Sequence, residues 1–255
     1  MDHRLGHQCL AALLEAVSQD SRADANEPMP AGGEAASRPA CDGQGAATHM
    51  NASDERNWIL SAVHRAAQRT GIDWPPPGAA PLRDMIAAFN LVHDEVPALT
   101  YVQVAKYLDR AGIEPPSEYW LKNIPLAGFV FANANGGYIL VQSDDPVPRR
   151  RFSAAHELGH FLLHFSANPE DDGAGFVQDD ATLNESDDEK LAAQERQANR
   201  FAAELLMPEA TCRTIVAETL EKSSKSSRYL EHRLAGAFLV SRAAAQWRLR
   251  SLGLA

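Results

Sequence analysis

Residues 149–165 read RRRFSAAHELGHFLLHF, a helical and largely apolar stretch with two histidines four positions apart and a glutamate beside the first. Residues four apart on a helix are turned by only ~40° and displaced by ~6 Å, so His156 and His160 project from one face. Their imidazoles can therefore bind one ion, and Glu157 can reach a water molecule on that ion without being a ligand. The pattern is typical of zinc peptidases and makes Zn²⁺ the expected cofactor and Glu157 the expected catalytic base.

A plainer interpretation is that both histidines are core residues with ordinary hydrogen-bond partners. Two imidazoles and a carboxylate this close together among apolar side chains would be costly to bury unless each had a partner. Gly159 adds a further indication, because glycine inside a helix costs about 1 kcal/mol relative to alanine and suggests a packing or access requirement. The metal-binding interpretation is therefore the stronger one.

A catalytic zinc site has three protein ligands and one open position, so the two histidines need a third ligand. His164 lies ~12 Å along the same helix from His156, which is too far for both to bind one ion, and we expect it in the wall of the site. Ser166 stands where the longer metzincin motif would have its third histidine. The metzincin subclass is therefore excluded.

The third ligand is expected on a second helix over residues 189–207, because residues 186–189 match a capping box and Pro208 follows the apolar periodicity. Glu195 lies in the middle of the apolar stripe of this helix, where a carboxylate requires a cation. Asn199 shares that face and could hydrogen-bond a ligating imidazole. The stripe consists of Leu191, Ala198, Ala202 and Leu205.

Two alternatives to Glu195 as a ligand remain open. Glu195 could be an exposed helix charge paired with Asn199 or Arg196, since element boundaries inferred from sequence carry errors of a few residues. Glu204 is the other carboxylate that could bind the metal, although the periodicity of the helix directs it toward the outer face.

A β-hairpin is expected before the motif helix, because the runs GFVFA at 128–132 and YILVQ at 138–142 are separated by the turn-forming NANGG. The edge of this hairpin, at Phe129–Ala132 or at Tyr138–Val141, could pair with the backbone of an extended substrate. Tyr138 and His164 are the candidate donors to the oxyanion that forms during peptide hydrolysis.

Helical periodicity dominates the remaining chain, and the predicted fold class is α+β, mainly helical, with a small β-hairpin packed on the active-site helix. Residues 1–52 are expected to be disordered apart from a short helix over 10–17, because large apolar residues are almost absent from 21 to 50. The other expected divisions are a helical layer over 53–125 with helices at 58–67, 81–93 and 102–108, a metallopeptidase core over 126–210, and a C-terminal helical segment over 211–255.

The composition limits the classes of partner. A formal net charge of -10 argues against general nucleic-acid binding, and three scattered cysteines without disulfide or zinc-knuckle spacing favour a reducing cytoplasm. No stretch approaches the ~20 apolar residues that span a bilayer, and the N-terminus lacks an export signal, so no membrane partner is expected. The sequence gives no indication of the oligomeric state.

A DNA-binding module is a second possible function. Residues Leu234–Leu249 have the small-residue helix, turn and second helix of a helix-turn-helix. The arginines near this segment are Arg228, Arg233, Arg242, Arg248 and Arg250. Packing of these helices on the catalytic core is the preferred interpretation because the chain is acidic overall. A third possibility is a zinc site that is only structural, within a toxin–antitoxin or scaffold protein.

Three stretches together resemble the ImmA/IrrE family of metallo-endopeptidases: GFVFANANGGYILV at 128–141, RRRFSAAHELGHFLLH at 149–164 and ERQANRFAAELLMP at 195–208. The resemblance implies a zincin-like fold in which His156, His160 and Glu195 bind zinc and Glu157 is catalytic. Family members typically cut a helix-turn-helix repressor, so the resemblance implies a protein substrate of that kind. The chain departs from the family pattern in a long acidic loop over 170–185 and in the absence of a recognisable C-terminal sensor domain.

Overall fold

The computed structural model describes residues 51–76, 78–133, 136–165, 175–177, 189–222 and 227–254. These residues belong to one compact unit, Ala47–Ala255. The segment expected to be disordered, apart from its last two residues, lies outside the described residues, as do most of the capping box at 186–189 and nearly all of the acidic loop at 170–185. The predicted division boundaries at residues 125 and 210 stay predictions.

A four-stranded sheet in the order β1-β3-β2-β4 forms the β part of the fold. Its strands are β1 Leu91–Val96, β2 Gly128–Asn133, β3 Gly136–Gln142 and β4 Gly175–Val177. Strands β2 and β3 pair antiparallel along their whole length, which confirms the predicted hairpin. Strand β1 is parallel to β3, and β4 is antiparallel to β2.

The predicted helix over 81–93 is wrong in its second half. Helix α3 covers only Leu82–Ala87, and β1 follows it. Asn90 has a φ of 57°, a left-handed conformation that ends the helix and turns the chain into the strand. Pairing with β3 over six residues then overrides the helical periodicity of the local sequence.

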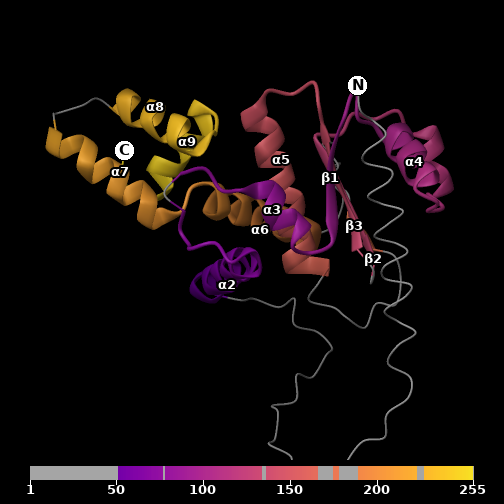
Figure 1. The fold of residues 1–255 in the computed structure, drawn as a ribbon, viewed down its shortest axis with the longest axis horizontal. Helices are drawn as coiled ribbons and strands as arrows, with labels where there is room; N and C mark the ends of the chain where they lie inside the picture. Colours follow the sequence, from indigo (N-terminus) through magenta and orange to yellow (C-terminus); the bar gives the residue numbers. More distant parts are fainter. Residues whose placement is uncertain are drawn as a thin grey trace, which may run out of the picture. The chain divides into compact units, whose positions relative to one another are not determined.

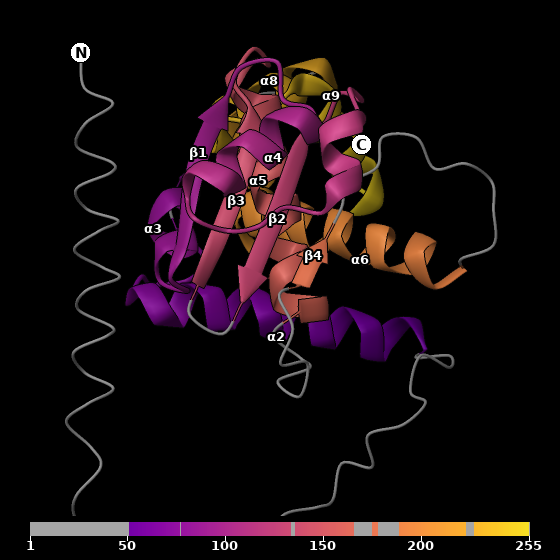
Figure 2. The same ribbon diagram turned by 90° about the vertical axis from the view of Figure 1, so that its right-hand side faces the viewer.

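Helices cover both faces of the sheet, α5 (Val147–His160) on one and α4 (Tyr101–Arg110) on the other (Figures 1 and 2). Because side chains alternate along a strand, Ile139 and Val141 share the core with α5, whereas the ring of Tyr138 packs against Tyr107 of α4. The short 3₁₀ helix Ser117–Leu121 packs with α4. The active-site helix is thus packed on the sheet, as the fold class predicted.

The motif helix also packs on α6 (Glu189–Leu206). Helix α6 in turn contacts α2 (Ala52–Thr70), and the motif helix contacts α3. Gly159 lies at the closest approach, since a Cβ there would stand 3.0 Å from a ring carbon of Phe201 and 3.2 Å from Cα of Ala198. The packing requirement indicated by Gly159 is therefore real. After His160 the helix widens into a π-helical turn, Phe161–Phe165.

The C-terminal segment forms α7 (Glu209–Lys222), α8 (Ser227–Phe238) and α9 (Arg242–Ser251). Leu239, at a φ of 55°, makes the turn between α8 and α9, and Ser241 caps α9 by accepting from the N–H of Ala244 at 3.1 Å. Both helices bury apolar side chains in the common core, in agreement with the packing interpretation of this segment. None of the described helices combines the length and apolar character that crossing a membrane requires.

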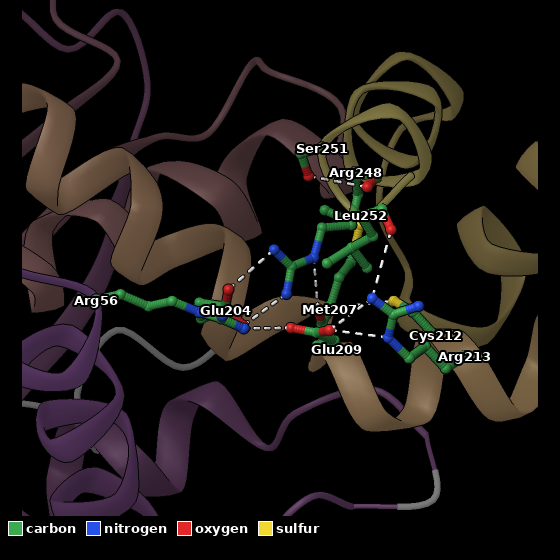
Figure 3. Close-up of polar contacts among 9 residues, drawn as sticks. All are labelled: Arg56, Glu204, Met207, Glu209, Cys212, Arg213, Arg248, Ser251 and Leu252. Carbon is green, nitrogen blue, oxygen red and sulfur yellow. Dashed lines mark hydrogen bonds and ion pairs between the residues drawn. The ribbon is translucent and has the colours of Figure 1, made fainter. Parts of the chain in front are cut away.

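A polar network attaches α9 to α6 (Figure 3). Arg248 is 4% exposed, and its guanidinium donates to Glu204 at 3.0 Å and to the carbonyl oxygen of Met207 at 3.0 Å. Glu209 accepts from Arg213 at 2.8 Å and also pairs with Arg56 of α2. The network thus fixes the start of α7 and the middle of α9 relative to the helix that carries Glu195.

Candidate metal centre

Three predicted side chains converge between α5 and α6. The Nε2 atoms of His156 and His160 are 3.0 Å apart, and the Glu195 carboxylate lies 3.2 Å from the first and 3.0 Å from the second. All three ligand atoms lie within 4.8 Å of one another. Ligands ~2.1 Å from one tetrahedral ion would be ~3.4 Å apart, so this donor set fits a single divalent ion.

The surroundings of Glu195 favour its ionised form. Burial alone would raise the pKa of this carboxyl, but hydrogen bonds from His156 and His160 outweigh burial and lower the pKa to about 2. The two rings are also buried, so water does not compete with Glu195 for contact with their ring nitrogens. Glu195 is therefore a charged oxygen donor over the whole pH range in which a peptidase works.

Asn199 sets the tautomer of His156. Its Oδ1 lies 3.1 Å from Nδ1 of His156, so the ring nitrogen must donate this hydrogen bond. Nε2, the nitrogen that faces His160 and Glu195, donates to Glu195 only while the ring carries both protons. In the neutral ring the proton stays on Nδ1, so Nε2 has the lone pair that a metal ion needs. The predicted contact between Asn199 and a motif histidine is confirmed.

Glu157 is fully buried beneath the start of β2. Gly128 faces it across this contact, and a Cβ at residue 128 would overlap Oε1 of Glu157 and approach its Cγ to 3.0 Å. The room for the Glu157 carboxylate therefore depends on a glycine in the hairpin. Sequence reasoning missed the role of Gly128, although a glycine that opens a β-type run could have suggested a close approach.

The sequence model of peptidase family M78, described as an IrrE N-terminal-like domain, matches residues 120–250. The chain belongs to this family. Membership makes it a peptidase of the metal-dependent class and implies a bound metal, typically zinc. The match extends beyond the motif stretches and includes most of α9. No curated protein matches the chain.

In this M78 family member, replacing Asn199 with alanine is expected to weaken zinc binding ~10-fold. The His156 ring loses the acceptor that fixes its tautomer, and such losses commonly cost 10- to 100-fold in metal affinity. Competition with a fluorescent zinc chelator measures the change. Asn199→Asp, which keeps an oxygen acceptor, serves as the control and should bind zinc at least as tightly as the native protein. If Asn199→Ala bound zinc as tightly as the native protein, Asn199 would not orient the His156 ring.

Gly128→Ala is expected to lower the rate constant of peptide hydrolysis ~100-fold without changing the zinc content. The new methyl group displaces the buried Glu157 carboxylate, and misplacing a reacting group by ~1 Å can cost that much. The rate and the zinc content are measured on the same preparation. Gly236→Ala on α8, where an added Cβ meets nothing within 4 Å, is the matched control. Native activity in Gly128→Ala would contradict the prediction that Glu157 is the catalytic base.

The other candidate residues lie outside the cluster. His164 donates from Nε2 to the carbonyl oxygen of Gln194 at 3.3 Å, and burial, helped by His160, lowers the pKa of its ring to about 4. Its ring lies beside that of His160, with the ring centroids 5.5 Å apart, and its donor is already used, while its predicted place in the wall of the site stays a prediction. Glu204 is held by Arg248 and does not join the metal cluster. Tyr138 is wrong as an oxyanion donor, because it lies on the α4 face of the sheet.

The predicted substrate edge of the hairpin is also largely wrong. Strand β3 is paired on both sides, with β1 and with β2, so Tyr138–Val141 offers no edge. Strand β4 covers β2 over Val130–Ala132. Among the described strand pairings, β2 extends past β4 at Gly128 and Phe129 at one end and at Asn133 at the other, so Phe129 is the part of the predicted edge that β4 does not cover.

Proposed function

We propose that this metallopeptidase is a zinc-dependent endopeptidase in which His156, His160 and Glu195 hold the zinc ion and Glu157 is the general base. One observation carries the proposal: two buried imidazole nitrogens and an ionised carboxylate meet within 4.8 Å of one another. Two histidines and one carboxylate are a donor set that catalytic zinc sites use while keeping a further position open. The family membership of the chain agrees with this chemistry.

The side chains around the cluster have distinct tasks in hydrolysis. When bound, zinc supplies a Lewis acid that polarises the scissile carbonyl and makes water acidic enough to lose a proton near neutral pH. Glu157 takes that proton as the water oxygen bonds to the carbonyl carbon, and returns it to the amine nitrogen as the C–N bond breaks. Asn199 fixes the orientation of the His156 ring. His164 donates a hydrogen bond to the carbonyl oxygen of Gln194, the α6 residue before Glu195.

The proposed substrate is a regulatory protein, specifically a helix-turn-helix transcriptional repressor, as the resemblance to ImmA/IrrE peptidases implies. The proposed pairing site for an extended segment of this substrate is the beginning of β2, because Gly128 adjoins Glu157. The proposed location is the cytoplasm, where scattered cysteines without disulfide spacing are usual.

Metal removal tests the endopeptidase assignment. The purified protein with one equivalent of zinc is expected to cut internal bonds in a proteome-derived peptide library, with new ends identified by mass spectrometry. Treatment with 1,10-phenanthroline should abolish cleavage, and added zinc should restore it. Cleavage that survives complete metal removal, or release of terminal residues alone, would contradict the proposal.

The repressor substrate is tested in cells. Proteomes are compared between cells that produce the native chain and cells that produce Glu157→Gln. A helix-turn-helix protein is expected to disappear, and a new internal terminus to appear, only with the native chain. Reproducible cleavage of proteins that are not transcriptional regulators would show that the substrate class is wrong while the peptidase assignment stands.

A further inference from the structure

We propose that a cleft beside the metal cluster binds a bulky apolar side chain of the substrate and that helix α9 determines which side chains fit. This inference rests on the proposed peptidase function. The cleft has a volume of about 760 Å³, which lies within the range of small-ligand sites. It is formed mainly by α5, α6, α9 and the turn before α9.

The cleft is continuous with the metal cluster. His156 and Glu195 are part of its wall, and Asn199 lies beside them. A side chain in the cleft would therefore lie next to His156 and Glu195. It would belong to a substrate residue at or next to the bond that is cut. This position makes the cleft a site for selecting substrates and not a remote surface pocket.

The chemistry of the wall favours an apolar occupant. Most of the described lining residues are apolar: Ala127, Pro148, Phe152, Ala203, Met207, Val240, Ala244 and Trp247. The two charged lining residues are already engaged, Arg149 by Asp145 at 3.0 Å and Glu195 by both motif histidines. A charged side chain would lose water without gaining a free counter-charge, whereas a leucine or phenylalanine would bury apolar surface.

Helix α9 and the turn before it supply the wall opposite the motif helix. Ala244 and Trp247 are three residues apart on α9, so both face the cleft. Trp247 is 55% exposed, although an aromatic ring of this size normally buries most of its surface. A substrate side chain packed against the indole would cover that surface.

The polar network keeps this wall rigid. Arg248, the neighbour of Trp247, is buried and donates to Glu204 and to the carbonyl oxygen of Met207, which itself lines the cleft (Figure 3). Arg248 follows Trp247 directly and lies one helical turn after Ala244, so its bonds hold this part of α9 at a fixed distance from the metal ligands. Fixed walls select by size, and one methylene in such a pocket changes rates ~10- to 200-fold.

A comparison of two tryptophan variants tests the proposal. The native protein should prefer leucine, phenylalanine or methionine by at least ~10-fold over alanine and aspartate at one position flanking the cut in the peptide library. Ala244→Trp narrows the cleft beside the metal ligands and should shift this preference to alanine and glycine. Ala243→Trp adds the same side chain at the preceding residue, which is exposed and does not line the cleft, and should keep the native preference. Trp247→Ala removes a wall and should broaden the preference.

An unchanged preference in both Ala244→Trp and Trp247→Ala would overturn the proposal, as would a native preference for charged residues at every flanking position. A binding measurement separates this outcome from failure of the peptidase function. N-acetyl-phenylalanine amide should shift the Trp247 indole signal in NMR spectra of the native protein, and N-acetyl-aspartate amide should not. If the native protein cuts no peptide, the proposed function fails, and the NMR measurement alone tests the cleft. Equal shifts of the Trp247 signal with the two amides, or no shift with either, would then overturn the proposal.

Discussion

Glu157→Gln is expected to lower the rate of peptide hydrolysis by ~10²- to 10⁴-fold, the range associated with loss of a general acid–base group. Glutamine has nearly the shape of glutamate and fits the fully buried position beneath Gly128, but its amide cannot accept the proton of the attacking water. Zinc content and thermal stability should stay at native values, because Glu157 is not one of the converging ligands. Library cleavage rates and metal analysis on one preparation measure both quantities.

The matched control is Glu218→Gln, the same change at an exposed position of α7. It should cleave at the native rate. Native activity in Glu157→Gln with zinc bound would mean that another group accepts the proton, and the mechanism would have to be reassigned.

Arg248→Met is expected to lower the free energy of unfolding by roughly 3 kcal/mol, at the lower end of the cost of breaking a buried ion pair. The change removes the guanidinium that bonds Glu204 and the carbonyl oxygen of Met207 and leaves a mostly buried carboxylate without its partner. Urea unfolding followed by circular dichroism measures the loss. Arg250→Met, an exposed position on the same helix, should change stability by less than ~0.5 kcal/mol.

A double variant, Arg248→Met with Glu204→Met, distinguishes the ion pair from simple packing. Removing both charges should recover much of the lost stability, because no unpaired charge remains in the interior. If the double variant were as unstable as the sum of the two single variants, the pair would not be coupled, and the role given to the network in fixing α9 would be wrong.

The residues near the motif were predictable because helix geometry alone relates them. The spacing of His156 and His160, the apolar stripe through Glu195 and the position of Asn199 all follow from the helical repeat. The hairpin was predictable for a similar reason, since its two strands are adjacent in sequence and joined by a short turn. In each case local periodicity and final structure agree.

The errors occurred where distant segments meet. The strand β1 exists because it pairs with β3, and its own sequence gives no strong strand signal. The same pairing removed the edge expected at Tyr138, and the alternation of side chains turned that tyrosine away from the motif helix. Arg248 was among the arginines considered for DNA contact, yet it is buried against Glu204, a partner on another helix that periodicity could not identify.

Anomalous X-ray scattering at the zinc edge, recorded from crystals of the zinc-loaded native protein, would locate the ion directly. One strong peak is expected within bonding distance of Nε2 of His156, Nε2 of His160 and the carboxylate of Glu195. A zinc peak bound by other residues, or no peak among these three side chains in protein that contains a full equivalent of zinc, would contradict this expectation.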